Sequence, residues 1–256
     1  MSITCKLVLT ILGLTLGSQA QTRATDAPAD SAKKPQDAPF AISRNLKEQK
    51  KPKAHTASSN TRPARKITMK ISGDWHSLGR GDAPLILMEF TDYECPLCRA
   101  FHSDTFPNLR KKYIETGQLR FVSRDQPLDM HPHARTAAEA ALCAGDQGNF
   151  WQMRDALISS STSEGLPDLA VETVLKHAES LSLDMNNFRS CLEKGKHKAE
   201  IQSDCAEAAS LQLIGTPTFV LGEPNADILT GVVIVGAQPY SVFDDAIQGM
   251  LVKKPK

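Results

Sequence analysis

The sequence predicts an α/β protein whose elements run β-α-β, then a block of helices, then β-β-α. Three observations predict it: an apolar run at 85–90 that leads into a helical pattern, an alanine-rich helical stretch at about 134–213, and two short apolar runs near the C-terminus. Because the strands on either side of the helical block can join one mixed sheet, we interpret the block as an insertion and not as a separate domain.

The first part of this pattern is a strand, a helix and a second strand. Residues 85–90 are almost continuously apolar, which is typical of a strand that is buried on both faces. Residues 99–114 carry apolar side chains at helical spacing, and residues 119–123 form the second candidate strand. A strand, helix and strand in this order imply a parallel pair with a right-handed crossover.

The rest of the predicted domain follows the same reasoning. Glycines and one Gly-Leu-Pro step divide residues 134–213 into four or five helices, which we expect to form a cap. Residues 218–221 and 232–235 then predict a closing hairpin, and Gln238-Pro239 begins a last helix that runs through Met250.

The N-terminal residues predict export. Lys6 precedes an apolar run at 7–16, and small residues at 17–20 follow, which is the pattern of a signal peptide cleaved before Gln21. An uncleaved anchor is the alternative, but the run has only half of the ~20 apolar residues that span a bilayer. No later segment of the sequence is long and apolar enough, so we expect a soluble protein in the periplasm or otherwise exported.

The region after the signal peptide is basic and poor in aliphatic residues. Such a composition cannot bury enough apolar surface to offset the entropy of ordering the chain. We therefore expect a signal peptide at 1–20, a disordered basic linker at 21–66, and a folded domain at 67–256 with the insertion at about 134–213. A net charge of +1 and 5% aromatic residues argue against a nucleic-acid partner.

The motif that carries chemistry is Cys95-Pro96-Leu97-Cys98, which lies between the first strand and its helix. Unpaired backbone N–H groups and the helix dipole at a helix start stabilise a thiolate, so Cys95 is the expected nucleophile. Cys98 is then the resolving thiol that attacks a mixed disulfide. Pro96 at the first helical position costs nothing, because its missing N–H would have had no partner.

Zinc sites use the same cysteine spacing, so a metal-binding or scaffold protein is the non-enzyme alternative. A structural zinc site needs two more cysteine or histidine ligands at matched spacing. His102, His131 and His133 are scattered along the sequence. We therefore expect no metal and interpret the pair as a redox motif.

From about Ile71 to Leu251 the chain resembles the DsbA-like thiol:disulfide oxidoreductases of the thioredoxin superfamily. The resemblance implies a thioredoxin-like fold with a helical insertion, and no cofactor. The matching motifs, besides the cysteines, are Glu89-Phe90, the segment 124–128, the segment 137–145 at the start of the insertion, Gly215-Thr216-Pro217-Thr218-Phe219, and the segment 236–239.

The resemblance also implies roles for particular residues. Pro217 is expected to be cis, to face the cysteine pair and to belong to the catalytic set; an ordinary trans proline that opens a strand is the alternative. Thr216, Pro96 and Leu97 are expected to contact the substrate, Thr216 through its backbone in the manner of an added β-strand. Glu89 is expected to relay the proton of Cys98 if burial raises its pKa, or else to be a satisfied strand residue.

Three further cysteines, Cys143, Cys191 and Cys205, lie in the helical block. Spacing alone leaves all three pairings open, and also permits three buried thiols. The family resemblance implies a structural Cys143–Cys191 disulfide, which would leave Cys205 as a buried free thiol.

The function that we predict is an exported oxidase that donates its Cys95–Cys98 disulfide to substrate proteins. Cysteine-containing exported proteins are the expected substrates, a membrane redox partner would reoxidise the pair, and we expect a monomer. The alternative is a disulfide isomerase or reductase that an electron donor keeps reduced. Thr216 leaves this alternative open, since both kinds of enzyme in the family have threonine before the proline.

Overall fold

A computed structural model describes residues 65–71 and 76–252, and all of them lie in the second of the chain's two units, Ser58–Lys256. The expected signal peptide at 1–20 and nearly all of the expected linker at 21–66 therefore lie outside the described residues. Within the described ranges, no helix is both long and apolar enough to cross a membrane.

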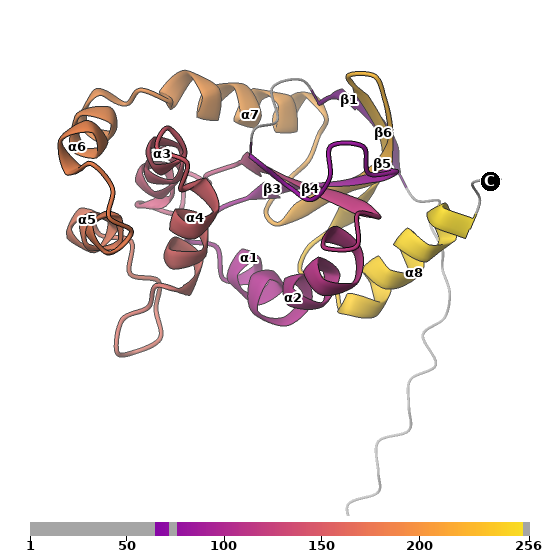
Figure 1. Ribbon diagram of the computed structural model, residues 1–256, viewed down its shortest axis with the longest axis horizontal. Coiled ribbons are helices and arrows are strands. Elements are labelled where there is room, and N and C mark those ends of the chain that lie inside the picture. Colours follow the sequence, from indigo (N-terminus) through magenta and orange to yellow (C-terminus); the bar gives the residue numbers. More distant parts are fainter. Residues whose placement is uncertain (1–64, 72–75, 253–256) are drawn as a thin grey trace, which may run out of the picture. The chain divides into compact units, whose positions relative to one another are not determined.

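One mixed sheet of six strands organises the described residues (Figure 1). Its order is β1-β6-β5-β3-β4-β2; β3 and β4 are parallel, and every other neighbouring pair is antiparallel. This arrangement confirms the predicted mixed sheet with the helical block as an insertion. The strands are β1 (Lys66–Lys70), β2 (Ser77–Leu78), β3 (Leu85–Thr91), β4 (Leu119–Asp125), β5 (Thr218–Asn225) and β6 (Ile228–Val235).

β3 lies inside the sheet and all seven of its residues are buried. Its side chains alternate between two cores, with Leu85 and Leu87 on one face and Ile86 and Met88 on the other. Glu89 follows Leu87 on the first face, which brings a carboxylate among apolar side chains. A strand that must be apolar on both sides therefore holds one acid at the end that meets the cysteine motif.

A single helical segment follows the motif and covers that first face. It is not uniform, because Pro107 lies in its interior and has no N–H to donate to the preceding turn. Two π-helical turns accommodate the break, one before and one after the proline. The segment consists of α1 (Pro96–Ala100), η1 (Phe101–Thr105), α2 (Phe106–Leu109) and η2 (Arg110–Ile114).

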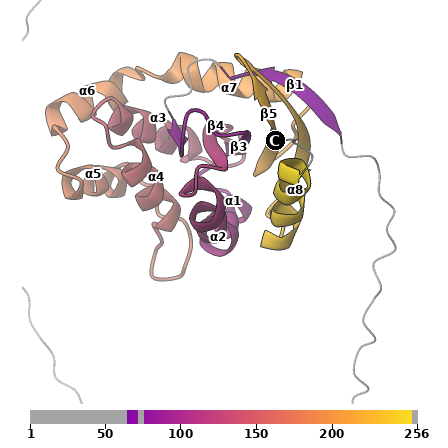
Figure 2. The same cartoon turned by 45° about the vertical axis from the view of Figure 1, so that its right-hand side comes forward.

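The insertion contributes five helices and its own apolar core. Its last helix, α7, lies on the face of the sheet opposite to α1, α2 and the C-terminal α8 (Figures 1 and 2). The helices of the insertion are α3 (Ala134–Gly145), α4 (Phe150–Ser159), α5 (Val171–Ser180), α6 (Met185–Lys194) and α7 (Lys198–Ser210). The C-terminal helix is α8 (Tyr240–Val252).

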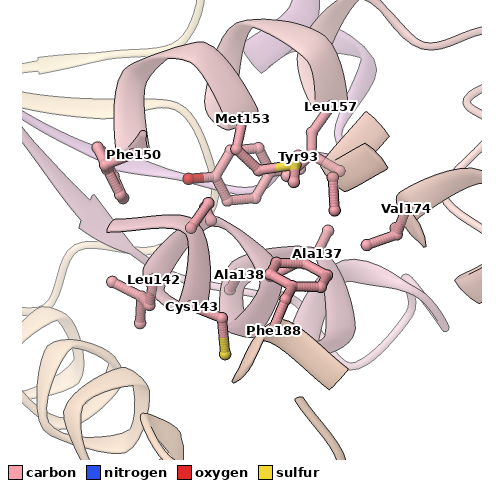
Figure 3. Close-up of a cluster of buried hydrophobic side chains, with 14 of the residues drawn as sticks. Tyr93, Ala137, Ala138, Leu142, Cys143, Phe150, Met153, Leu157, Val174 and Phe188 are labelled. Atoms are coloured by element: carbon pink, nitrogen blue, oxygen red, sulfur yellow. The ribbon is translucent and has the colours of Figure 1, made fainter. Parts of the chain in front are cut away.

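The core of the insertion extends to the active-site turn. Tyr93, which lies just before the cysteine motif, points into the cluster between α3 and α4 and is 1% exposed (Figure 3). At the edge of the same cluster Cys143 of α3 forms a disulfide with Cys191 of α6. This is the pairing that the family resemblance implies. Cys205 is free, but it is only half-buried, so the expectation of a fully buried thiol is wrong.

Two strands do not appear in the sequence-based prediction. β1 is an edge strand that pairs only with β6, and Met69 is its one buried residue, so its sequence lacks a strong apolar signal. β2 has two residues and pairs only with β4. β1 also begins at Lys66, one residue before the start that we expected for the folded domain.

Candidate active site

The turn between β3 and α1 places Cys95 at the start of a helix. Its backbone is extended (φ −67°, ψ 122°) and Pro96 follows at the first helical position, as the motif predicts. The carbonyl of Cys95 accepts the first bond of the helix from the N–H of Arg99, at 3.1 Å. The N–H groups of the first helical turn are therefore free to stabilise charge at Cys95.

The environment of Cys95 favours the thiolate. A hydrogen bond from the Cys98 thiol is the largest cause, and the backbone N–H groups of Cys98 and Leu97 add to it; burial opposes them, and the pKa of Cys95 falls to about 5. In its protonated form, the Sγ of Cys95 donates to the carbonyl of Thr216 at 3.4 Å. Cys95 is therefore a nucleophile and a good leaving group near neutral pH.

Cys98 has the opposite character. It is fully buried, and the N–H of Asp92 donates to its Sγ at 3.4 Å. Burial, the hydrogen bond to Cys95 and the charge of Glu89 all raise the pKa of Cys98 well above its ordinary value. Both thiols are free in the structure. Cys95 has the lowered pKa of a nucleophile, and Cys98 has the raised pKa of a resolving thiol that keeps its proton.

The loop before β5 forms the other side of the site. The Thr216–Pro217 peptide bond is cis, as the family resemblance implies. Thr218 anchors this loop by donating a hydrogen bond from its hydroxyl to the carbonyl of Gly215 at 2.7 Å. Thr216, far from the cysteines in sequence, thus lies directly against the Cys95 thiol through its carbonyl.

Asp92 is a structural centre of the site that the sequence analysis missed. One carboxylate oxygen accepts from the N–H groups of Glu94 (2.8 Å) and Cys95 (3.2 Å). The other accepts from the N–H of Leu128 and from Nδ1 of His131, both at 2.8 Å. Asp92 therefore fixes the cysteine turn to the loop after β4. The available signal was an aspartate three residues before Cys95, in the turn that leads into the helix, where this side chain commonly orders a turn.

His131 contributes charge to this side of the site. Burial alone would lower its pKa, but the hydrogen bond and charge of Asp92, together with the charges of Cys95 and Glu94, raise it. In the sequence, His131 is one of several scattered histidines. The structure places a readily protonated imidazole within electrostatic range of the Cys95 thiolate.

Glu89 lies beneath the cysteines, but its electrostatics differ from the expectation. Burial pushes its pKa up, whereas His102 and the Arg154 guanidinium hold it below its usual value. The expected relay required burial to raise the pKa of Glu89. This condition is not met, because the buried Arg154 guanidinium compensates the charge of the carboxylate. Glu89 is therefore a carboxylate that can accept a proton, and not a carboxylic acid that holds one.

Arg154 and His102 are the other members of this buried group. Nη2 of Arg154 donates to Oε2 of Glu89 at 2.5 Å, and Nε2 of His102 lies 2.9 Å from the same oxygen. The guanidinium of Arg154 is fully buried and lies over the rings of Phe121 and Trp151, at 5.6 and 5.3 Å. The sequence offered no signal for Arg154, because α4 lies in the insertion and reaches Glu89 only through the fold.

Exposed apolar side chains follow Cys95 and precede Thr216 in the sequence. Pro96 is exposed, Leu97 is 53% exposed, and Ile214, two residues before Thr216, is 87% exposed. Exposed apolar side chains beside a reactive thiol are suited to a partner that covers them. Of the three residues expected to contact substrate, Pro96 and Leu97 are exposed and Thr216 is buried.

One group of described residues has the spacing of metal ligands. The ligand atoms of Cys143, Cys191 and His197 lie within 4.8 Å of one another. Two of the three are joined in the disulfide, so the group offers one free ligand in this state.

Comparison with known proteins decides the family. A family model described as thioredoxin matches residues 72–230, more than half of the chain. Disulfide bond formation protein D of Bacillus subtilis (strain 168) is 30% identical over 161 residues, which cover 57% of this chain and 67% of that protein. The chain belongs to the DsbA-like thiol:disulfide oxidoreductases.

Other similarities of this DsbA-like chain concern the fold and the extent of the match. The crystal structure of oxidised BdbD from Bacillus subtilis covers 74% of this chain and 98% of its own, with a TM-score of 0.63 and 23% identity. The Na(+)/H(+) antiporter NhaA 3 of Salinispora tropica is 36% identical over 145 residues, which are 56% of this chain. Those residues are 21% of the antiporter, so the DsbA-like chain spans about a fifth of that relative's length.

Proposed function

We propose that this chain oxidises cysteine pairs of exported proteins by donating its Cys95–Cys98 disulfide. The observation that carries the proposal is the opposite character of the two thiols. Cys95, with its pKa at about 5, leaves readily as a thiolate, while Cys98 is buried and keeps its proton. Stabilising the reduced form in this way makes the disulfide a strong oxidant, since reduction of the pair is then favoured.

The proposed reaction transfers two electrons from the substrate to the pair. A substrate thiolate attacks Sγ of Cys95, the Cys95–Cys98 bond breaks, and Cys98 leaves and takes up a proton. The second substrate thiolate then attacks the substrate sulfur of the mixed disulfide, a substrate disulfide forms, and Cys95 leaves as a thiolate. In reoxidation the Cys95 thiolate attacks a partner's disulfide, and Cys98 loses its proton and closes the bond.

The loop and rim give this reaction its substrate contacts. In the proposal, an extended substrate segment pairs with the backbone of Thr216, while Pro217 keeps that loop against Cys95. Pro96 and Leu97 supply apolar contact at the exposed start of α1. Glu89 is the buried carboxylate that accepts the proton of Cys98 in passing; its lowered pKa keeps it ionised, so it does not hold the proton.

The cellular setting belongs to the same proposal. Cleavage of residues 1–20 would release the protein into the periplasm or an equivalent oxidising compartment, with 21–66 as a basic linker ahead of the folded domain. A membrane redox partner would regenerate the disulfide, and the protein would act as a monomer.

Trapping the intermediate tests the proposal. Oxidised full-length protein is mixed with a reduced, unfolded two-cysteine substrate without oxygen, and the products are alkylated and weighed by mass spectrometry. We expect substrate oxidation by the wild type and no reaction in Cys95→Ser. Cys98→Ser, first converted into its Cys95–glutathione disulfide, should exchange glutathione for the substrate and form a mixed disulfide through Cys95. Cys205→Ser, which removes a free thiol outside the site, should match the wild type. Substrate oxidation by Cys95→Ser would overturn the proposal.

A further inference from the structure

His102 lies between the buried carboxylate of Glu89 and a cavity that opens at the surface. Its Nε2 is 3.0 and 2.9 Å from the two carboxylate oxygens, and its side chain is 5% exposed. His102 is also one of the residues that line a cavity of about 530 Å³, between the active-site helical segment and α4. The walls of this cavity include Arg99, Phe106 and Asp155.

We propose that His102 carries the proton between Glu89 and water in this cavity each time Cys98 loses or regains it. Cys98 is fully buried, so its proton cannot pass directly to solvent. Glu89 is charged, buried and close enough to influence Cys98 electrostatically, but its carboxylate is fully buried as well. His102 is the member of this group that has both a hydrogen bond to Glu89 and a place in the cavity wall.

Charge balance supports His102 as the group that holds the proton. With Cys98 as a thiol and His102 neutral, Glu89 and Arg154 carry opposite charges and the buried group is neutral. When Cys98 becomes a thiolate, protonation of His102 restores neutrality, whereas release of the proton without it would leave an uncompensated buried anion. Uncompensated buried charge is costly, so the two proton movements are coupled.

During reoxidation the proton of Cys98 moves to water through Glu89 and His102. The Cys98 thiol gives its proton to the Glu89 carboxylate, and the thiolate attacks Sγ of Cys95 in the mixed disulfide, which expels the partner's thiolate. The Glu89 carboxylic acid passes the proton to His102, and His102 releases it to water in the cavity. When a substrate reduces the pair, the same steps run in reverse and protonate the leaving Cys98.

The charged groups that face His102 come from two packed elements. Glu89 of β3 and Asp155 of α4 favour the protonated form of His102. Burial and Arg154 of α4 oppose it. Because burial and Arg154 prevail, the pKa of His102 is lowered. His102 is therefore neutral at rest near pH 7 and ready to accept a proton, which a relay in this position requires.

The experiment measures one reaction, the formation of the Cys95–Cys98 disulfide, and it rests on the proposed function. Reduced full-length protein is mixed with excess oxidised glutathione between pH 5 and 8, and samples are quenched with acid. Mass spectrometry then follows the Cys95–glutathione adduct and its conversion into the Cys95–Cys98 disulfide. At pH 6 we expect His102→Ala to form the adduct at the wild-type rate but to close it about 100-fold more slowly. Its closing rate should rise about tenfold per pH unit, because hydroxide then replaces the relay.

Two further variants separate a relay from a structural role. His102→Asn retains hydrogen-bonding groups but cannot carry a proton, so it should close as slowly as His102→Ala. Added imidazole should enter the cavity and restore closing in His102→Ala, while His177→Ala, which removes a histidine of α5, should match the wild type throughout.

The outcomes distinguish the two proposals. Wild-type closing rates in His102→Ala, or slow closing with the wild-type pH profile and no response to imidazole, would overturn the relay and leave the proposed function intact. If the wild type forms neither the adduct nor the disulfide, the proposed function itself fails.

Discussion

The chain has two pairs of cysteines in the described domain, and their surroundings give them different chemistry. Cys95 and Cys98 lie in one turn at the start of a helix, with unpaired backbone N–H groups on one side and the Thr216 loop on the other. Cys143 and Cys191 lie 48 residues apart in sequence and join two helices of the insertion. The first pair stabilises a thiolate, and the second closes a long loop around an apolar core.

The comparison shows that reactivity here depends on local backbone and charge, and not on burial. All four cysteines are buried. Of the four, Cys95 has the helix N–H groups and the thiol donor that stabilise a thiolate, and the charge of His131 interacts with it. The imidazole near the second pair, that of His197, lies beside sulfurs that are already joined in a disulfide. The apolar side chains beside Cys143, such as Leu142 and Phe188, offer no such groups (Figure 3).

The largest expected effect separates the two pairs by activity. Cys95→Ala should abolish oxidation of a reduced substrate protein, because no mixed disulfide can form. The double variant Cys143→Ser/Cys191→Ser should retain the wild-type rate at a temperature where it is folded. Both are measured by the appearance of substrate disulfide after alkylation. A double variant that is folded and yet inactive would break the comparison.

The second prediction concerns the pH dependence of the reduced pair. Thiolate absorbance in the ultraviolet should show one transition near pH 5 in the wild type, absent in Cys95→Ser. Because the pKa of Cys95 in the folded protein is below the 9.0 of an ordinary cysteine, the thiolate stabilises the reduced fold fully above pH 9 and progressively less as the pH falls to 5. Below pH 5 the contribution is lost. A transition near pH 9 would remove the basis for Cys95 as a leaving group.

The third prediction concerns the stability that the second pair provides. A disulfide that closes a loop of 48 residues reduces the entropy of the unfolded chain, and the expected contribution is about 4 kcal/mol. The double variant Cys143→Ser/Cys191→Ser should lose this amount in urea unfolding, while its Cys95 pKa stays near 5. A changed Cys95 pKa would show that the two pairs are coupled.

The sequence predicted the parts of the fold and site that depend on neighbours in the chain. The apolar run of β3, the helix after it and the position of Cys95 at the helix start all follow from local pattern. The pKa of Glu89 does not, because its counter-ion Arg154 is 65 residues away in the sequence, on α4 of the insertion. Asp92 was missed for a similar reason, since half of its partners come from the loop after β4.

The smallest expected effect is a change of the Cys95 pKa when the charge of His131 is removed. His131→Ala removes an imidazole whose charge interacts with Cys95, so the Cys95 pKa should rise. The rise should stay below about one pKa unit, because partly exposed charge pairs contribute about 0.2–1 kcal/mol. Thiolate absorbance measures it, with His177→Ala as the matched control. A lower Cys95 pKa in His131→Ala would contradict the charge assigned to His131.

The reduction potential of the Cys95–Cys98 pair tests the central claim most directly. The full-length protein is equilibrated in glutathione redox buffers and its thiols are counted by alkylation, with Cys95→Ser to identify the contribution of the pair. A thiolate-stabilised pair that donates disulfides should have a potential near or above about −150 mV. A value near the roughly −270 mV of thioredoxin would contradict an oxidase and indicate a reductase supplied by an electron donor.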